Sequence, residues 1–283
     1  MTYYDAAVRA RSLLSDAGIL PETATFDADL LARHAVGWDL ATWLARRGEP
    51  ASAAFLERYQ PLVERRRARE PVAYIRGVQE FWGRQFQVTG AVLIPRPETE
   101  LLVEDAIRFL KDRPDASVVD IGTGSGCIAI TIALEHPSAR VYAVDISAPA
   151  LELARANAAR LGATGVHFVH GSLVADVPRP LDLIVTNPPY VAERDSPGLT
   201  PEVRDYEPGV ALYGGFDGWR HIRAILEATP EALLRDGCLL MELGYGQSER
   251  LASEVERTRG LTLHSISADL QGIPRVAIIT RSG

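Results

Sequence analysis

The chain has 283 residues, of which 47% are hydrophobic and 24% charged, and its formal net charge is −7 at pH 7. This length and apolar content suffice for one large domain, or for a large domain with a small one. The acidic balance argues against a protein whose main partner is duplex DNA, because such proteins usually present a basic surface. No apolar run is long enough to span a membrane, and no secretory signal is apparent after Met1.

The cysteine content favours a reducing compartment. Cys127 and Cys238 are the two cysteines of the sequence, too few for a disulfide framework or a thiolate zinc site. Both lie in apolar runs, so we expect them to be packing residues of the core. We therefore expect a cytoplasmic protein.

Residues 1–70 predict a small helical bundle. Apolar residues recur at helical spacing in four successive segments, and Gly18 and Gly37 are suited to end the first two. The run Glu64–Glu70, with sequence E-R-R-R-A-R-E, closes the bundle. Such a run is either a solvated helix face or a docking patch for an acidic or RNA-bearing partner.

Residues 71–96 differ in composition from the bundle. Aromatic and β-branched residues alternate loosely around three glycines, a pattern that predicts a β-hairpin linker. A helix is then expected from about Glu98 to Leu110. Pro97 suits its first turn, and Glu98 and Glu100 suit the positive end of its dipole.

In the third segment, residues 97–283, strands alternate with helices from Ser117 onward. Seven apolar runs predict strands near residues 118–121, 141–145, 167–170, 181–186, 238–243, 262–267 and 276–280. Helices are centred on residues 128–134, 149–161, 219–228 and 248–257. This order predicts an α/β fold with a doubly wound, mostly parallel sheet of seven strands, and it fits an antiparallel last strand.

The first strand of this sheet leads into a glycine turn, Gly122-Thr123-Gly124-Ser125-Gly126. Glycines let the backbone approach a ligand closely, and the helix that follows offers free N–H groups to an anion. The spacing G-x-G-x-G differs from the dinucleotide fingerprint G-x-G-x-x-G. It favours S-adenosylmethionine, whose carboxylate would meet the backbone amides. Asp120, just before the turn, would either hold the loop or attract the cofactor ammonium.

The next two strand ends extend the predicted cofactor site. Asp145 ends the second strand, where a carboxylate can accept both ribose hydroxyls. Ser172 and Leu173 follow the third strand, and we expect them to flank the adenine through backbone amides and packing. His167 and His170 have no partner at metal-ligand spacing, so we expect no metal.

The fourth strand ends in Asn187-Pro188-Pro189-Tyr190. Neither proline has an N–H to donate to a sheet ladder, so the chain leaves the sheet along a stiff path. The side-chain oxygen of Asn187 and the carbonyl of Pro188 then form a pair of acceptors, with Tyr190 as a flat wall, where open α/β sheets bind ligands. This site suits a planar group with an NH2, either a carboxamide or a base amine. Catalysis there would rest on positioning and preorganised dipoles, without a strong general base.

These segments together resemble the PrmC/HemK family, the glutamine methyltransferases of peptide chain release factors. The resemblance covers nearly the whole chain, and Asn-Pro-Pro-Tyr by itself is shared with amino methyltransferases of DNA and RNA. Its most specific part is the segment Pro95-Arg96-Pro97-Glu98-Thr99-Glu100 together with the helical front domain. Further matching stretches are Glu70–Gly77, Glu80–Gly83, Tyr206-Glu207-Pro208, Ala211-Leu212, Gly214-Gly215 and Asp217-Gly218.

The resemblance implies a class I S-adenosylmethionine methyltransferase sheet and S-adenosylmethionine as the methyl donor. It implies that the acceptor is the glutamine of a Gly-Gly-Gln loop in the release factor, and that the helical front domain helps to grip this partner. It also implies that Phe81 and Glu98 lie close to the junction of cofactor and substrate. One departure concerns the adenine contact: many relatives carry an acidic residue where Ser172 stands. We expect a monomer that binds neither duplex DNA nor a membrane.

Three other functions remain to be weighed. A DNA or RNA amino methyltransferase acting on a duplex would flip its base out of the stack, and it would need a basic recognition domain. A non-catalytic scaffold that binds S-adenosylmethionine is disfavoured by the intact Asn-Pro-Pro-Tyr segment. A nicotinamide enzyme is disfavoured by the glycine spacing.

Overall fold

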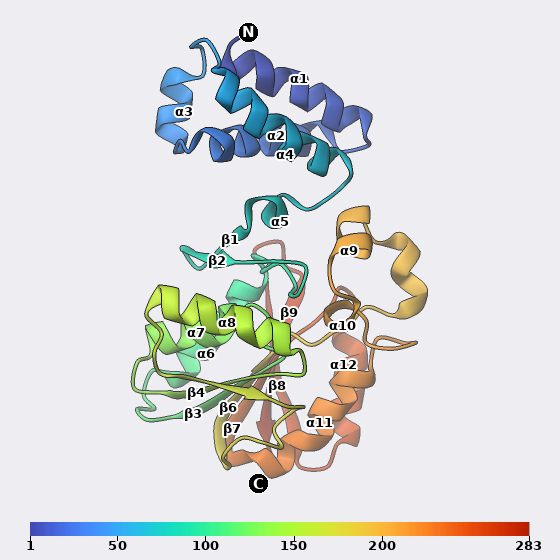
Figure 1. The fold of residues 1–283 in the computed structure, drawn as a ribbon. Coiled ribbons are helices and arrows are strands. Elements are labelled where there is room, and N and C mark those ends of the chain that lie inside the picture. The colour runs from blue at the N-terminus through green and yellow to red at the C-terminus, as the bar shows by residue number, and fades with distance from the viewer. Residues whose placement is uncertain (283) are drawn as a thin grey trace. The chain divides into compact units, whose positions relative to one another are not determined.

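The computed structural model describes residues 1–282, which form two units (Figure 1). Unit 1 comprises Met1–Val78 and the short segment Thr200–Tyr206. Unit 2 comprises Gln79–Leu199 and the chain from Glu207 onward. The chain therefore leaves unit 2 once, contributes one short helix to unit 1, and returns.

Unit 1 is helical, as predicted. Its helices are α1 (Tyr3–Asp16), α2 (Pro21–Val36), α3 (Leu40–Arg46), α4 (Ala53–Arg67), α5 (Val72–Arg76) and α9 (Pro201–Tyr206). Helix α1 begins with a capping box, in which Thr2 and Asp5 each accept a hydrogen bond from the other's backbone N–H. Helix α2 ends at Gly37, whose φ of 75° few other residues adopt without strain. Trp43 and Phe55 are fully buried at the centre of the bundle.

The arginine-rich run at the end of α4 holds α9 within unit 1. Arg66 is 4% exposed and pairs with Asp27 at 2.7 Å and with Glu202 of α9 at 2.8 Å. Arg69 grips the same Glu202 through two hydrogen bonds of 2.7 Å each. The run is therefore neither a wholly solvated face nor a free docking patch, because two of its arginines bind carboxylates of the same unit.

The segment after this run begins with a helix that the sequence does not predict. Helix α5 follows Pro71 and stops at Gly77, which has a φ of 72°. A two-stranded hairpin then follows, made of β1 (Val78–Phe81) and β2 (Arg84–Gln87). The hairpin is thus shorter than the predicted linker, because a proline at the start and a left-handed glycine at the end favour one turn of helix before it.

Unit 2 contains the predicted seven-stranded sheet, in the order β5-β4-β3-β6-β7-β9-β8. The strands are β3 (Ser117–Ile121), β4 (Arg140–Asp145), β5 (Val166–His170), β6 (Leu181–Thr186), β7 (Leu233–Glu242), β8 (Leu261–Ala268) and β9 (Pro274–Arg281). Strands β3 to β7 pair in parallel, and β9 lies antiparallel between β7 and β8. This confirms the predicted sheet with its antiparallel last strand.

Helices cover both faces of the sheet (Figure 1). They are α6 (Thr99–Leu110), α7 (Cys127–Glu135), α8 (Ala148–Leu161), α11 (Arg220–Ala232) and α12 (Ser248–Arg257), and two short helices, η1 (Glu193–Gly198) and α10 (Gly209–Leu212), lie in the connection between β6 and α11. Val118 packs with α6 and α7, whereas Val119 packs with α11 and α12, because successive strand residues point to opposite faces. Cys127 and Cys238 are buried and unbonded, which confirms their packing role.

The sheet order fixes where a ligand can bind. The strand order reverses between β3 and β6, which are parallel neighbours with Ile121 opposite Thr186. The residues that follow these two, Gly122 and Asn187, therefore leave the sheet side by side. Crevices at such reversal points are the usual ligand sites of doubly wound sheets. Within residues 1–282 no helix is long and apolar enough to cross a membrane.

Candidate active site

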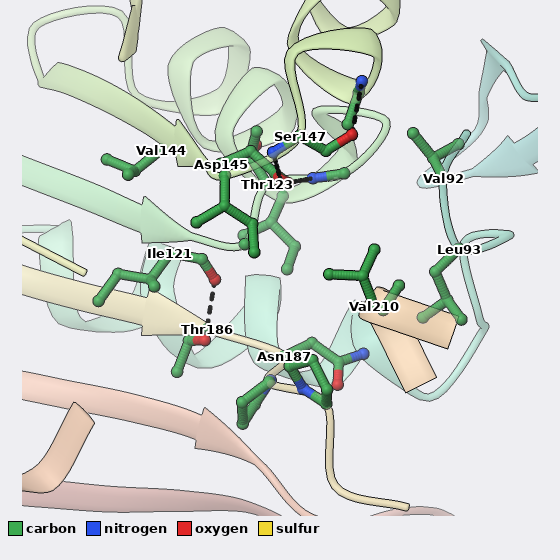
Figure 2. A pocket seen from close by; sticks show the side chains of 18 of the residues that line it. Val92, Leu93, Ile121, Thr123, Val144, Asp145, Ser147, Thr186, Asn187 and Val210 are labelled. Atoms are coloured by element: carbon green, nitrogen blue, oxygen red, sulfur yellow. Dashed lines mark hydrogen bonds between the residues drawn. The ribbon is translucent and has the colours of Figure 1, made fainter. Parts of the chain in front are cut away.

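A cavity opens at the carboxyl ends of β3, β4 and β6, entirely within unit 2. Figure 2 shows Thr123 and Asp145 on one side of it and Asn187 on the other, with Val92 and Leu93 at a third side. At the base of the cavity, the Thr186 hydroxyl at the end of β6 donates to the Ile121 carbonyl at the end of β3 at 2.9 Å. The glycine turn and the Asn-Pro-Pro segment therefore share one cavity.

The glycine turn depends on backbone conformations that side chains disfavour. Gly122, Gly124 and Gly126 have φ values of 75°, 54° and 82°. The first four residues of the predicted turn line the cavity, but Gly126 does not. A Cβ atom on Gly126 would lie 2.7 Å from the Ile130 side chain. Gly126 therefore serves the packing of α7 and is not a contact residue of the cavity, which corrects the prediction for this position.

Asp145 lines the cavity and also braces the turn. One carboxylate oxygen accepts the Gly124 N–H at 2.9 Å, and the other accepts the Ser147 N–H at 2.9 Å. Each carboxylate oxygen has a second lone pair. The side chain can thus hold the turn and still accept two hydroxyl groups from the cavity.

Asp120 lies behind the turn and does not line the cavity. It is fully buried, and its Oδ2 atom accepts the Thr123 hydroxyl at 2.7 Å and the Ala129 N–H at 3.2 Å. Burial raises the pKa of its carboxyl to about 7. Of the two roles considered for Asp120, these contacts are those of a residue that holds the loop.

The remaining cofactor wall is mixed in character. Ser172 and Leu173 line the cavity, and Leu173 adopts a left-handed φ of 57°. Cys127 and Ile128 begin α7 and also line the cavity, and the N–H groups of a first helical turn have no partner within the helix. Amide donors, an acidic acceptor and apolar side chains suit a ligand with a carboxylate, a ribose and an adenine, so these residues fit S-adenosylmethionine.

The Asn187 amide lies at the opposite side of the cavity (Figure 2). Pro188 and Pro189 also line the cavity. The Asn187 Nδ2 atom donates to the hydroxyl of Thr99 at 3.2 Å. Its Oδ1 atom accepts no hydrogen bond from residues 1–282. The side chain therefore has one tethered end and one end available to a ligand.

Tyr190 does not form the flat wall that the sequence predicts. Its ring is not part of the cavity lining, and it packs against the chain at Gly244, where a Cβ would come within 2.8 Å of the ring. Burial raises the pKa of its hydroxyl to about 12. Tyr190 therefore packs the loop against the segment that follows β7, where Gln247 also donates to the Tyr190 carbonyl at 3.4 Å.

A second chain segment fastens the Asn-Pro-Pro-Tyr loop from outside. Val191 exchanges backbone hydrogen bonds with Leu212 and Gly214, at 3.0 and 2.9 Å. A Cβ on Gly214 would lie 2.5 Å from the Pro189 carbonyl oxygen, and one on Gly218 would lie 2.4 Å from the Tyr190 carbonyl oxygen. Because Gly214 and Gly218 have no side chains, their backbone packs directly against the backbone of Pro189 and Tyr190, which keeps the loop rigid.

The Pro-Arg-Pro-Glu-Thr-Glu segment connects three other parts of unit 2 through side-chain contacts. Arg96 pairs with the buried carboxylate of Glu207, Thr99 donates to Glu242 at 2.6 Å, and Glu100 accepts the backbone N–H of Trp82 at 2.7 Å. Pro95, Arg96 and Thr99 also line the cavity. This segment therefore fastens the hairpin, the loop before α10 and the end of β7 around the site.

Phe81 and Glu98 do not reach the cavity, contrary to the expectation from the resemblance. Phe81 is 1% exposed and packs edge-on against Phe86 in the core under α6. Glu98 is exposed and directly precedes the first residue of α6, without a capping hydrogen bond from its side chain. The hairpin directs Phe81 into the core, and the segment contributes Pro95, Arg96 and Thr99 to the cavity lining.

Sequence reasoning did not identify Thr99, Glu242 or Asn157. Asn157 of α8 bonds the Ser125 carbonyl at 2.9 Å and both backbone groups of Gln87, and so joins the glycine turn to the hairpin. Glu242 could have been found from the sequence, because it is a single charged residue at the end of an apolar strand. Asn157 lies in a polar helix without a motif and gave no signal.

The carboxyl-end cavity, the glycine turn with its ribose-type acceptor, and the sheet order define a class I methyltransferase. In agreement, residues 98–201 match the family model described as "Methyltransferase small domain", and residues 5–77 match "PrmC N-terminal domain". The ribosomal protein L11 methylase of Lactobacillus delbrueckii has a similar fold, with a TM-score of 0.51 and 21% identity over 72% of this chain and 89% of that one.

Two curated relatives cover almost the whole chain. The release factor glutamine methyltransferase of Geobacter sulfurreducens is 42% identical over 267 residues, which is 94% of this chain and 92% of the relative. That of Cereibacter sphaeroides is 41% identical over 273 residues, or 96% of each chain. The chain belongs to the release factor glutamine methyltransferase family.

Proposed function

We propose that this protein transfers a methyl group from S-adenosylmethionine to the side-chain amide nitrogen of the glutamine in the Gly-Gly-Gln motif of peptide chain release factors. The product would be N5-methylglutamine. The observation that carries this proposal is the untethered Oδ1 atom of Asn187 in the same cavity as the glycine turn. The names of the relatives support the same substrate.

The glycine-turn side of the cavity would hold the methyl donor. The N–H groups of Gly122 and Thr123 donate to the Val144 carbonyl and that of Gly124 donates to Asp145. The backbone amides of Ser125 and of Cys127 at the start of α7 would therefore meet the carboxylate of the donor, Asp145 its ribose, and Ser172 and Leu173 its adenine. When bound there, S-adenosylmethionine supplies an electrophilic methyl group. Asp120 acts behind the turn by keeping its backbone in place.

The Asn-Pro-Pro side would hold the acceptor amide. An amide nitrogen is a weak nucleophile, because its lone pair is conjugated with the carbonyl. Asn187 Oδ1 and the Pro188 carbonyl can accept its two N–H groups, which orients the nitrogen and favours the charge that develops on it. No general base is required at the start, since the nitrogen becomes acidic once it gains the methyl group and then loses a proton.

Unit 1 would contribute to partner recognition. Its apolar side chains Leu20 and Phe26 are 73% and 65% exposed, which suits contact with a protein. In this proposal residues 1–70 grip the release factor, residues 71–96 link the two parts, and residues 97–283 carry out the transfer. We further propose that the protein acts in the cytoplasm as a monomer and does not bind duplex DNA.

A labelling experiment tests this function. The purified protein is incubated with methyl-labelled S-adenosylmethionine and either a release factor, the same factor with its motif glutamine changed to alanine, plasmid DNA or RNA. We expect label in the first substrate alone. Label that persists in the alanine variant, or that appears only in nucleic acid, would overturn the proposal.

A further inference from the structure

A chain of two hydrogen bonds connects a buried carboxylate to the Asn187 amide. Strands β6 and β7 are parallel, with Thr186 opposite Met241, so Asn187 and Glu242 follow at the same edge of the sheet. Thr99, the first residue of α6, lies between them. Its hydroxyl donates to Glu242 Oε2 at 2.6 Å and accepts from Asn187 Nδ2 at 3.2 Å.

Both supporting residues are buried, and Glu242 has no cation partner. Thr99 and Glu242 are each 3% exposed, and within residues 1–282 Glu242 forms no salt bridge. Arg96 and Arg275 favour its charge from a greater distance, whereas Glu98 opposes it. A buried carboxylate without an ion pair lowers stability, so its presence next to the site calls for a role in function.

The direction of these bonds decides which end of the Asn187 amide faces the cavity. An ionised carboxylate can only accept, so Thr99 must donate its one hydroxyl proton to Glu242. Towards Asn187 the hydroxyl can then only accept, and it must meet the NH2 group. We propose that Glu242 and Thr99 form a positioning pair that fixes the Asn187 amide with its oxygen toward the acceptor glutamine. This inference rests on the function proposed above.

Protonation of Glu242 removes the preference for the Asn187 orientation in which the NH2 group faces Thr99. Burial raises the pKa of Glu242 to about 7, and the charged groups that face it are Glu98, Arg96 and Arg275. The Tyr190 hydroxyl and the Cys127 thiol also face it, but both are neutral near pH 7 because burial raises the pKa of each to about 12. A protonated Glu242 donates to Thr99, which frees the Thr99 proton for the oxygen of Asn187. Both amide orientations are then satisfied, so turnover should fall as the pH drops through about 7.

The first experiment compares two threonine-to-valine variants of the full-length protein. Thr99→Val removes the connecting hydroxyl, whereas Thr131→Val removes a buried hydroxyl of α7 that has no hydrogen-bond partner within residues 1–282. We expect Thr99→Val to lower kcat by about 10- to 100-fold, because small misplacements of a positioning group have effects of this size. Affinity for S-adenosylmethionine should stay within about twofold, since the turn is untouched. Thr99→Ser should recover most of the loss.

Glu242→Gln provides the second readout. A glutamine can either donate to or accept from Thr99, so kcat should fall and the decline near pH 7 should disappear from its pH profile. Equal kcat values in Thr99→Val and Thr131→Val would overturn the inference. A pH profile unchanged by Glu242→Gln would overturn it as well.

The third readout does not depend on the substrate. The side-chain amide resonances of Asn187, identified by their loss in Asn187→Asp, should shift with pH near 7 in the parent and not in Thr99→Val. If the parent shows this shift but does not methylate a release factor, the proposed function fails, whereas the coupling of Glu242 and Thr99 to the Asn187 amide stands. If the parent methylates the factor but shows no shift, the positioning pair fails alone.

Discussion

The two sides of the cavity each depend on a buried carboxylate, and the two carboxylates act differently. Asp120 and Glu242 both lie at strand ends, and burial raises the pKa of each to about 7. Asp120 accepts hydrogen bonds from the Thr123 hydroxyl of the glycine turn and from the Ala129 N–H of α7, and so fixes the backbone around the turn. Glu242 accepts one hydroxyl, from Thr99, and so holds a side chain. Substitution of Asp120 should therefore lower cofactor affinity and protein stability, whereas substitution of Glu242 should lower turnover.

The largest effect is expected at the residue that the second carboxylate serves. Asn187→Ala removes an acceptor aimed at the glutamine amide and should lower kcat by about 10²- to 10³-fold, as for loss of a preorganised transition-state contact. Affinity for S-adenosylmethionine, measured by calorimetry, should change little. Parallel losses of kcat and cofactor affinity would show that Asn187 supports the whole cavity and not the acceptor alone.

The matching change on the other side is Asp120→Ala. It leaves the Thr123 hydroxyl and the Ala129 N–H buried without their acceptor, which should lower the free energy of unfolding by roughly 2–4 kcal/mol. Cofactor affinity should fall with it, because the turn loses its support. Urea unfolding and calorimetry measure both quantities, and a stable variant with normal affinity would remove the distinction between the two carboxylates.

The stability of the folded protein should depend on pH through Glu242. The folded-state pKa of Glu242, about 7, lies above its ordinary value of 4.5, so the folded protein binds more protons and loses stability as the pH rises between these values. The loss reaches about 3 kcal/mol above pH 7. Glu242→Gln removes the titrating carboxyl and so avoids this loss. At pH 8 the variant should therefore be more stable than the parent, and at pH 4.5 the two should be closer in stability. Melting temperatures at the two pH values test this, and a variant less stable than the parent at pH 8 would contradict it.

The smallest of these effects is expected at Asp145. Asp145→Ala takes away the proposed ribose acceptor and also the acceptor of the Gly124 and Ser147 N–H groups. The dissociation constant for S-adenosylmethionine should therefore rise by roughly tenfold or more. At saturating cofactor kcat should be close to that of the parent. An unchanged dissociation constant would count against the ribose role.

The parts of the molecule that the sequence predicts are those encoded locally. Each parallel strand is a short apolar run bounded by turn residues, so the seven strands and their mostly parallel, doubly wound arrangement could be predicted from the sequence, whereas their order in the sheet comes from the structure. The connection between β6 and α11 could not, because η1, α9 and α10 are short and its glycines at 214 and 218 serve contacts with the Asn-Pro-Pro-Tyr loop.

The same distinction applies within the site. The glycine turn and the Asn-Pro-Pro segment are continuous motifs, and the structure brings them into one cavity. Thr99 and Glu242 are 143 residues apart and meet only because β7 pairs beside β6. Phe81 shows the converse, since a residue singled out by resemblance lies in the core.

The most direct measurement is a crystal structure with S-adenosylhomocysteine and a peptide containing the Gly-Gly-Gln motif. We predict that the glutamine amide nitrogen lies within hydrogen-bond distance of both Asn187 Oδ1 and the Pro188 carbonyl oxygen, with the cofactor product on the glycine turn. An amide bound away from Asn187, or an Asn187 side chain with its NH2 group toward the peptide, would contradict it.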